Sequence, residues 1–276
     1  MKKLIITGAS SGIGCRLASC FSGSYKVWGC SRAEHPELPG SFKFTPHVNI
    51  ANWDSIRRFS VKVKKEWSSI DALICCAGLQ GPIGPAMKAD VTQWSETVRT
   101  NLDGMFYTIK AFHNLLMRGR AHIPSTSSHP TQQPRAKVIC LAGGGAGYSR
   151  PHFSAYAASK TAVVRLVETL ADEWKGQHID INALAPGAFP SRMTQQIVEA
   201  GRDVVGGQAY TDALHVGVRL GIKEQLLLTT VAFLLSNESA GVSGKFISAQ
   251  QNDVKEPDLA KPNLYVLRRV TEIHSY

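Results

Sequence analysis

Short strand-like runs alternate with helix-like runs along almost the whole chain, and this alternation constrains the fold more than any other feature. Runs such as KLIIT, ALICC and KVICL are nearly all apolar, which is typical of parallel strands buried on both faces. The pattern predicts strands at Lys3–Thr7, Lys26–Cys30, Lys43–His47, Ala72–Cys76, Lys137–Leu141, Asp180–Leu184 and Lys245–Ser248. It predicts helices at Gly12–Phe21, Trp53–Trp67, Thr92–Met117, Ser154–Lys175 and Lys223–Leu235. Because crossovers are right-handed, we expect an α/β fold with one Rossmann-like, doubly wound parallel sheet of about seven strands and helices on both faces.

The length and composition favour one large unit. The chain has 276 residues, of which 43% are hydrophobic and 19% charged, enough for a sizeable core. We therefore expect a single domain over 1–276. The segment at about 119–136 is rich in Ser, Thr, Pro and His and is predicted to be a mobile loop. The segment at about 189–219 is predicted to cover a substrate; the alternative is a surface loop without a role in binding. The segment at 250–276 is predicted to be an extended C-terminal tail.

Several classes of protein are disfavoured by the sequence. Six cysteines lie mostly in apolar runs without metal-ligand spacing, so we expect reduced thiols and no metal site. The first apolar run, Leu4–Ile6, is too short for a signal peptide, and no run approaches the roughly 20 residues of a membrane span. The expectation is a cytoplasmic protein without a membrane partner.

The formal net charge of +10 favours an anionic ligand. Lys and Arg are scattered, with only the short cluster KVKK at Lys62–Lys65, and aromatic residues are not interleaved with a basic run. We therefore expect an anionic cofactor and a small-molecule substrate, and no nucleic acid.

A glycine-rich turn, TGASSGIG at Thr7–Gly14, joins the first predicted strand to the first predicted helix. Glycines at such a turn let the backbone approach a pyrophosphate, and the helix N-terminus supplies N–H groups and a positive dipole end. A glycine triplet alone is weak evidence for a nucleotide site. Its position between a predicted strand and a predicted helix makes that evidence much stronger. The predicted phosphate-binding residues are Gly8, Ser10, Ser11, Gly12, Ile13 and Gly14.

The end of the second predicted strand carries Cys30-Ser31-Arg32, where a site for NAD usually has an acid that binds the ribose hydroxyls. Arg32 could instead pair with the 2′-phosphate of NADP by charge-assisted hydrogen bonds, and Ser31 could add another. NADP(H) is therefore favoured over NAD, although an arginine after a strand is otherwise unremarkable.

Tyr156 and Lys160 lie four residues apart on a predicted helix, so they share one face. A cation beside a phenol lowers the pKa of the phenol toward the range in which a general acid or base works best. A tyrosine and a lysine four residues apart often occur on a helix by chance. Its position downstream of the glycine turn makes the pair a candidate for proton transfer.

Taken in order along the chain, these motifs resemble the classical short-chain dehydrogenases/reductases. TGASSGIG matches TGxxxGxG of that family, Asn49 falls at the usual adenine-contacting acid, and Ala77-Gly78 matches the second half of NNAG, with Cys75-Cys76 in place of the asparagines. The resemblance extends to Asn101, Pro186-Gly187 and Ser191 in the later motifs.

The resemblance implies a mechanism and a cofactor site. Tyr156 would exchange a proton with a carbonyl or alcohol oxygen, Lys160 would bind the nicotinamide ribose, and Asn101 would hold a proton-relay water. Asn49, Ala77, Gly78, Pro186, Gly187 and Ser191 would contact the cofactor. A homodimer or homotetramer packed through the helices at Thr92–Met117 and Ser154–Lys175 is also implied.

Gly143 stands where the family has its catalytic serine, thirteen residues before the tyrosine. Losing one such hydrogen-bond donor costs on the order of 10²–10³ in rate. The backbone N–H groups of Gly143–Gly145 could replace it, or a group of the substrate or another hydroxyl, such as that of Tyr148 or Ser149, could do so. Alternatively, the chain could be a catalytically weak nucleotide-binding protein that acts as a sensor or scaffold. If the missing donor limits the rate, Gly143→Ser should be tolerated and should raise activity.

The function predicted from the sequence is an NADP(H)-dependent oxidoreductase that acts on a secondary alcohol or ketone, with a polar or sugar-like substrate. Arg192, Arg202 and Arg219, in or next to the covering segment, would suit an anionic substrate, but each is equally well explained as a solvated surface group.

Overall fold

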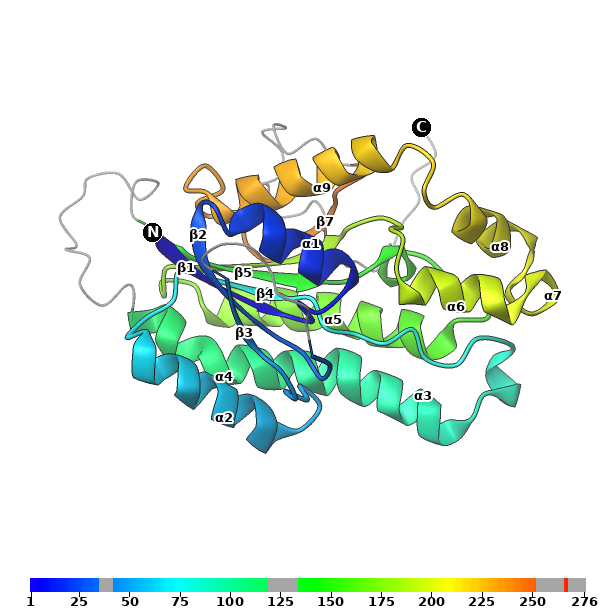
Figure 1. Ribbon diagram of the computed structural model, residues 1–276, viewed down its shortest axis with the longest axis horizontal. Helices are drawn as coiled ribbons and strands as arrows, with labels where there is room; N and C mark the ends of the chain where they lie inside the picture. Colours follow the sequence, from blue (N-terminus) through cyan, green and yellow to red (C-terminus); the bar gives the residue numbers. More distant parts are fainter. Residues whose placement is uncertain (35–41, 119–133, 252–265, 268–276) are drawn as a thin grey trace, which may run out of the picture.

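The computed structural model describes residues 1–34, 42–118, 134–251 and 266–267. In this part of the chain seven parallel strands form one sheet in the order β3-β2-β1-β4-β5-β6-β7 (Figure 1). The strands are β1 (Lys2–Thr7), β2 (Tyr25–Cys30), β3 (Phe42–Thr45), β4 (Ala72–Cys75), β5 (Ala136–Leu141), β6 (Ile179–Ala185) and β7 (Phe246–Ser248). The predicted fold class is confirmed, because the apolar runs pair as parallel strands buried on both faces.

Helices cover both faces of the sheet, with α1 and α9 on one face and α2, α4 and α5 on the other (Figure 1). The helices are α1 (Gly12–Phe21), α2 (Trp53–Glu66), α3 (Val91–Val98), α4 (Gly104–Arg118), α5 (Ser154–Glu173), α6 (Arg192–Ala200), α7 (Arg202–Val205), α8 (Gly207–Leu214) and α9 (Leu220–Leu235). Short turns lie at η1 (Ala86–Lys88), η2 (Arg99–Asp103) and η4 (Gly144–Ala146).

The core follows the two-residue period of the strands. In β1, Leu4 and Ile6 belong to a buried cluster with residues of α1 and α9, whereas Ile5 belongs to a second cluster with residues of α2, α4 and α5. Successive side chains of a strand point to opposite faces, so one strand supplies both cores.

Two predicted elements differ in extent. The strand predicted to reach His47 ends at Thr45, because Pro46 has no N–H for the ladder and His47 has a left-handed φ of 58°. The helix predicted over Thr92–Met117 is divided by the π-helical turn η2, which separates α3 from α4. The extra residue of a π turn brings Asn101 into the interior, where it is fully buried.

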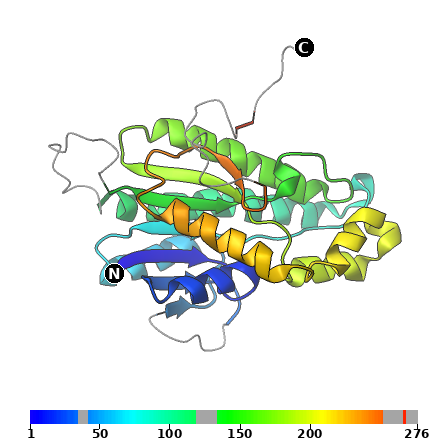
Figure 2. The ribbon, with the colours of Figure 1, turned by 90° about the horizontal axis from the view of Figure 1, so that it is seen from above.

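The segment at 189–219 contains three short helices, α6, α7 and α8, separated by Gly201 and Gly206 with left-handed φ. Figures 1 and 2 both place these helices at one end of the molecule, beyond the carboxyl ends of the strands. The loop predicted at about 119–136 and the tail predicted at 250–276 lie mostly outside the described residues.

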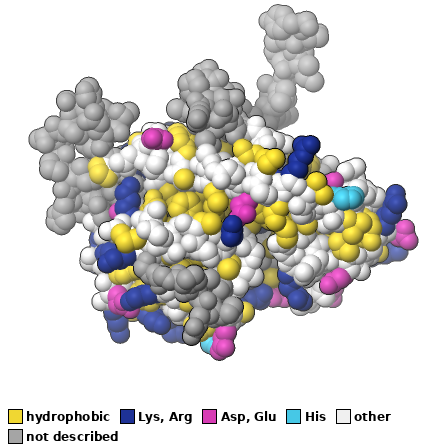
Figure 3. Space-filling model, turned by 45° about the horizontal axis from the view of Figure 1, so that its top comes forward, with side chains coloured by type: hydrophobic (Ala, Val, Ile, Leu, Met, Phe, Trp, Pro, Cys, Tyr) yellow, Lys and Arg dark blue, Asp and Glu magenta, His cyan; other side chains and the backbone are white. Residues whose placement is uncertain are grey.

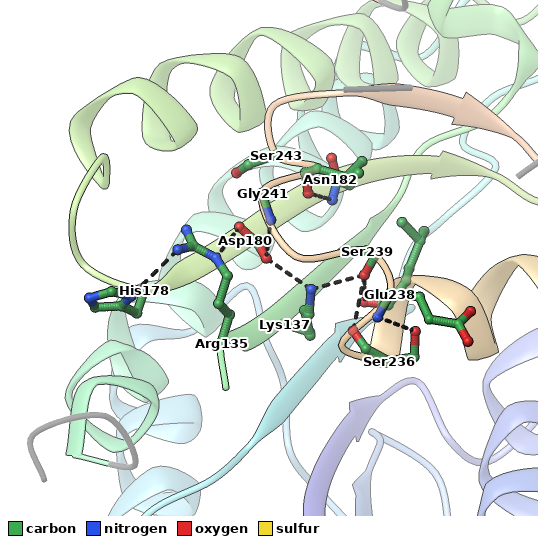
Figure 4. Close-up of polar contacts among 12 residues, drawn as sticks. Arg135, Lys137, His178, Asp180, Asn182, Ser236, Glu238, Ser239, Gly241 and Ser243 are labelled. Atoms are coloured by element: carbon green, nitrogen blue, oxygen red, sulfur yellow. Dashed lines mark hydrogen bonds and ion pairs between the residues drawn. The ribbon is translucent and has the colours of Figure 1, made fainter. Parts of the chain in front are cut away.

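A buried ion cluster joins β5 and β6 near their amino ends (Figure 4). Lys137 and Asp180 are register partners, and the Lys137 Nζ lies 2.8 Å from Asp180 Oδ2 while Arg135 Nε lies 2.7 Å from Oδ1. Lys137 Nζ also donates to Ser239 Oγ at 2.9 Å, which ties the chain after α9 to the sheet. Burial lowers the pKa of Lys137, and the Asp180 carboxylate opposes that shift.

Asp180→Asn should destabilise the fold strongly, because it leaves the two cations beside an uncharged amide in the interior. The expected loss is about 3–5 kcal/mol of unfolding free energy, measured by urea denaturation. Asp172→Asn on α5 is the matched control, since Asp172 is 75% exposed and forms a surface ion pair with Lys175. Equal losses in the two variants would contradict this account of the cluster.

Candidate active site

A cavity of about 1380 Å³ opens at the carboxyl edge of the sheet. It is lined by residues that follow β1, β2, β4, β5 and β6, and by residues of the segment that holds α6, α7 and α8. The strand order reverses between β1 and β4, and ligands of doubly wound sheets bind outside the carboxyl ends of the strands at such a switch point. Because small-molecule sites are usually about 300–1,000 Å³, the space suits a dinucleotide together with a second ligand.

The glycine turn forms one end of the cavity, and all six predicted residues, Gly8, Ser10, Ser11, Gly12, Ile13 and Gly14, line it. Gly8 has a φ of 71°, and a Cβ there would lie 2.8 Å from the Ala77 Cα. A Cβ on Gly14 would overlap the Gly8 carbonyl oxygen. The Ser11 side chain makes no capping bond at the N-terminus of α1. A tightly packed glycine backbone at the start of a helix fits a pyrophosphate.

The end of β2 places Ser31 and Arg32 in the cavity wall. Ser31 Oγ donates to the Ala33 carbonyl at 2.6 Å, and Arg32 is half exposed with its Nη1 3.7 Å from Glu96 Oε1. Glu34, the nearest acid along the chain, instead lies 3.5 Å from His47 Nε2 and is absent from the cavity wall. Asn49 lines the same end, with its Oδ1 accepting from the Ala51 N–H at 3.0 Å.

The loop after β4 is held by buried side chains on both sides. Thr7 Oγ1 accepts from the Cys76 and Ala77 N–H groups at 3.2 and 3.4 Å. Gly78 lies between Asn101 and Lys160, because a Cβ there would be 3.1 Å from Asn101 Oδ1 and 3.4 Å from Lys160 Nζ. The loop therefore brings Ala77 and Gly78 into the cavity wall.

Asn101 uses its whole side chain to hold this loop. Its Oδ1 accepts from the Leu79 N–H at 2.7 Å, and its Nδ2 donates to the Leu79 carbonyl and to Ser159 Oγ, both at 2.9 Å. Both amide hydrogens are thus in use. The side-chain oxygen accepts one hydrogen bond, from Leu79, and an amide oxygen has capacity for a second.

Tyr156 and Lys160 lie on one face of α5, are 9% and 3% exposed, and line the cavity. Lys160 Nζ donates to the Leu141 carbonyl at 2.7 Å and lies 5.8 Å from the centre of the Tyr156 ring. Burial raises the pKa of Tyr156 and lowers the pKa of Lys160 to about 8. The prediction that Lys160 lowers the pKa of Tyr156 is wrong here: burial dominates, and the cation that opposes it is Arg150.

Gly143 is packed against the tyrosine. A Cβ on Gly143 would lie 2.6 Å from the Tyr156 Oη, and a Cβ on Gly144 would overlap the Tyr148 hydroxyl. The Tyr156 hydroxyl therefore occupies space that a side chain at position 143 would need. Gly143→Ser would therefore require the Tyr156 hydroxyl to move, and whether the serine is tolerated and raises activity stays a prediction.

The loop after β6 completes the wall with Pro186, Gly187 and Ser191. Ser191 caps α6 in a reciprocal capping box with Thr194. A Cβ on Gly187 would lie 2.6 Å from Gln250 Cγ, and Gln250 Nε2 donates to the Pro186 carbonyl at 3.1 Å. Gln250 was not predicted, because its contact with Pro186 joins positions 64 residues apart.

Three further cavity residues were also missed: Gln80, Arg150 and His152. Arg150 Cζ lies 4.1 Å from the centre of the Phe153 ring and 5.4 Å from that of Tyr156. The basic residue six positions before the tyrosine, in SRPHFSAY, was the available signal. Of the basic residues predicted near the covering segment, Arg192 lines the cavity and Arg202 and Arg219 do not.

The cysteines, candidate metal ligands, helix hydropathy and surface charge of the described residues bear on the remaining predictions. The six cysteines are free thiols, and no group of three His, Cys, Asp or Glu side chains in the described ranges is placed to hold a metal ion. Among the helices described, none combines the length and apolar character required to cross a bilayer. On the face drawn in Figure 3, Lys and Arg side chains are scattered among Asp and Glu side chains.

Comparison with known proteins shows the family. The model described as short chain dehydrogenase matches residues 2–201. The 3-oxoacyl-[acyl-carrier-protein] reductase FabG of Thermotoga maritima is 29% identical over 259 residues, covering 89% of this chain and 95% of the relative. Gluconate 5-dehydrogenase of Gluconobacter oxydans is 26% identical over 258 residues, covering 89% and 91%.

Levodione reductase, a solved structure, superposes with a TM-score of 0.74 at 20% identity and covers 90% of this chain and 95% of its own, a likeness in fold. Since the family model spans most of the chain, and the curated relatives match it almost end to end, the protein belongs to the short-chain dehydrogenase family of oxidoreductases, whose members bind NAD or NADP.

Proposed function

We propose that this protein is an NADP(H)-dependent oxidoreductase that interconverts a secondary alcohol and a ketone on a polar, sugar-like substrate. One observation carries the proposal: Tyr156 and Lys160 face the same cavity as the glycine turn. A phenol, a buried cation and a phosphate-binding turn in one cavity are the groups that hydride transfer to a carbonyl requires. The similarity to gluconate 5-dehydrogenase supports a hydroxylated substrate.

In the proposed reaction Tyr156 donates its proton to the carbonyl oxygen, or removes it from the alcohol in the reverse direction. A nicotinamide, when bound, supplies or accepts the hydride. Lys160, held at the Leu141 carbonyl beside the loop at Gly78, binds the ribose hydroxyls. Asn101 acts as a positioning residue, since its side chain fixes Leu79 and Ser159. Phe153 packs with Tyr156, Ile197 and Val205 and excludes water from the back of the phenol.

The proposed preference for NADP rests on the second strand. Arg32 is half exposed at the cavity wall, and its pairing with Glu96 at 3.7 Å is weak enough to be exchanged for a phosphate. Ser31 adds a hydroxyl beside it. The acid nearest in sequence, Glu34, faces His47, so it does not oppose a 2′-phosphate at the wall.

A second candidate function is a catalytically weak nucleotide-binding protein, and Gly143 favours it. The hydroxyl of the family's serine is missing, and the Tyr156 Oη packs against the glycine where that side chain would stand. Tyr148 is 67% exposed with its hydroxyl over Gly144, so it is placed to supply a replacement donor. Measured turnover separates the two functions.

Three earlier predictions remain proposals. We expect a homodimer or homotetramer packed through α4 and α5, a cytoplasmic location, and no nucleic-acid or membrane partner.

Tyr156→Phe should lower kcat by about 10²–10⁴-fold, because it removes the proton donor, and should leave the dissociation constant of NADPH within about two-fold. NADPH consumption with a panel of sugar and cyclic ketones measures kcat, and fluorescence titration measures binding. Tyr25→Phe, whose hydroxyl donates to Leu235 away from the cavity, is the control. Unchanged turnover in Tyr156→Phe would remove Tyr156 from the reaction.

A roughly ten-fold loss of kcat in Tyr148→Phe would identify Tyr148 as the hydrogen-bond donor that replaces the serine.

Arg32→Gln should weaken NADPH binding by about 10- to 100-fold, the value of a charge-assisted hydrogen bond, and should leave NADH binding within about two-fold. Arg58→Gln on the exposed surface of α2 is the matched control. The preference is refuted if the unaltered protein binds NADPH and NADH equally well in a fluorescence titration.

Lys160→Met should stabilise the fold at pH 7 while abolishing turnover. Burial holds the folded-state pKa of Lys160 at about 8, below its usual 10.5, so this charge reduces stability below pH 8 and the loss is recovered as pH rises from about 8 to 10.5. That shift corresponds to on the order of 3 kcal/mol, and losing the bond to Leu141 removes about 1 kcal/mol of the gain. Urea unfolding should therefore show a gain of about 2 kcal/mol at pH 7 that shrinks toward pH 10. Lys64→Met on α2 is the control, and a gain independent of pH would contradict this explanation.

A further inference from the structure

Arg150 is a cation at the substrate end of the cavity that the reaction above does not use. Its guanidinium lies over the rings of Phe153 and Tyr156, and its Cδ lies 3.4 Å from the Cβ position of Gly145. It is half-buried, and no residue in the described part of the chain forms an ion pair or side-chain hydrogen bond with it. A guanidinium fixed by two rings keeps its N–H edge free for a planar, bidentate partner.

Gln80 and His152 bring two unsatisfied nitrogens to the same wall. Gln80 Nε2 and His152 Nδ1 are buried and have no hydrogen-bond partner in the described residues, and Gln80 is only 4% exposed. Their loops are joined by the hydrogen bond from the Gly84 N–H to the His152 carbonyl at 2.8 Å. Buried polar groups without partners are costly, so their presence beside a cavity indicates a ligand that completes them.

The charged residues of the cavity wall are mostly basic. Arg150 and Arg192 line the cavity, while the acid that lines it, Asp212, is exposed and accepts from Gln208 Nε2 at 2.8 Å. Lys160 adds charge beside the reacting centre. An anionic group of a substrate would therefore be attracted to this end, and the amide hydrogens of Gln80 would provide additional donors for its oxygens.

We propose that Arg150, together with Gln80 and His152, binds a carboxylate of the substrate, so that the protein acts on hydroxy acids and keto acids. Arg150 holds the carboxylate in bidentate fashion, and its position over the Tyr156 ring places the carboxylate close to the carbon that reacts. The proposal rests on the proposed oxidoreductase function and adds the class of its substrate. The reaction is the reduction of a keto acid to a hydroxy acid by NADPH, with the proton from Tyr156, or its reverse.

The test compares keto acids of four to six carbons with their methyl esters, and with phosphate monoesters of hydroxyketones of the same length, by NADPH consumption. The unaltered protein should prefer the acids by about 10- to 100-fold in kcat/KM, the value of a hydrogen-bonded charge. Arg150→Met should lose that preference, because kcat/KM should fall by about 10- to 100-fold more on the acids than on the esters, chiefly through a higher KM for the acids. Arg150→Lys should restore part of it, and Arg58→Met should behave like the unaltered protein.

Several outcomes would overturn the assignment. Equal kcat/KM for acids and esters would refute the carboxylate site while leaving the oxidoreductase function standing. A preference for the phosphate monoesters would refute the carboxylate in favour of a phosphate. An equal fall of kcat on acids and esters in Arg150→Met, with a shifted pH profile, would make Arg150 a positioning residue for Tyr156.

Absence of turnover on every compound would count against the oxidoreductase function and not against the site. Binding then decides: calorimetric titration of the NADPH-loaded protein with the same acids and esters should show that the acids bind and the esters do not. Loss of acid binding in Arg150→Met supports the site. Unchanged acid binding in that variant refutes it.

Discussion

The hydrogen-bonded junction between β1 and β4 is the constraint on which the rest of the structure depends. The strand order reverses at this junction, so the crossovers on either side lead away from each other and leave a space at the carboxyl edge. Thr7 fixes the edge by accepting from the N–H groups of Cys76 and Ala77, and Gly8 packs against the Ala77 backbone. A side chain at position 8 would separate the two strands at the point where the cavity begins.

The site at this edge contains a buried ammonium group, Lys160, and a buried phenol, Tyr156. Burying the charge of Lys160 lowers the stability of the fold. Lys160 is 3% exposed, and its pKa lies well below its usual value for that reason. Asn101, Ser159 and the Leu141 carbonyl supply the hydrogen bonds that hold this interior in one arrangement. At the amino edge of the sheet the buried charges are paired, because Asp180 contacts both Arg135 and Lys137. Breaking this ion cluster would destabilise the sheet.

Much of this could be predicted from the sequence. Apolar runs, turn glycines and helix periodicity depend on neighbours within a few residues, so they indicated all seven strands and placed the glycine turn, Tyr156 and Lys160 in one site. The division of the α3–α4 helix was missed, because it depends on Asn101 binding Leu79, 22 residues away. The relation of Tyr156 to Gly143 was predicted as a missing hydroxyl, whereas the structure shows a ring packed into the vacant volume.

The sequence by itself determined the fold class, the family and the identity of the α5 residues that face the cavity, because periodicity and short motifs are local. Only the tertiary structure decided the electrostatics of the site. Whether the pKa of Tyr156 is raised or lowered depends on how deeply the phenol is buried and on which nearby cation opposes that burial, and the cation that does so is Arg150. Burial and the approach of loops distant along the chain are properties of the packed sheet, and they have no signature in a run of neighbouring residues.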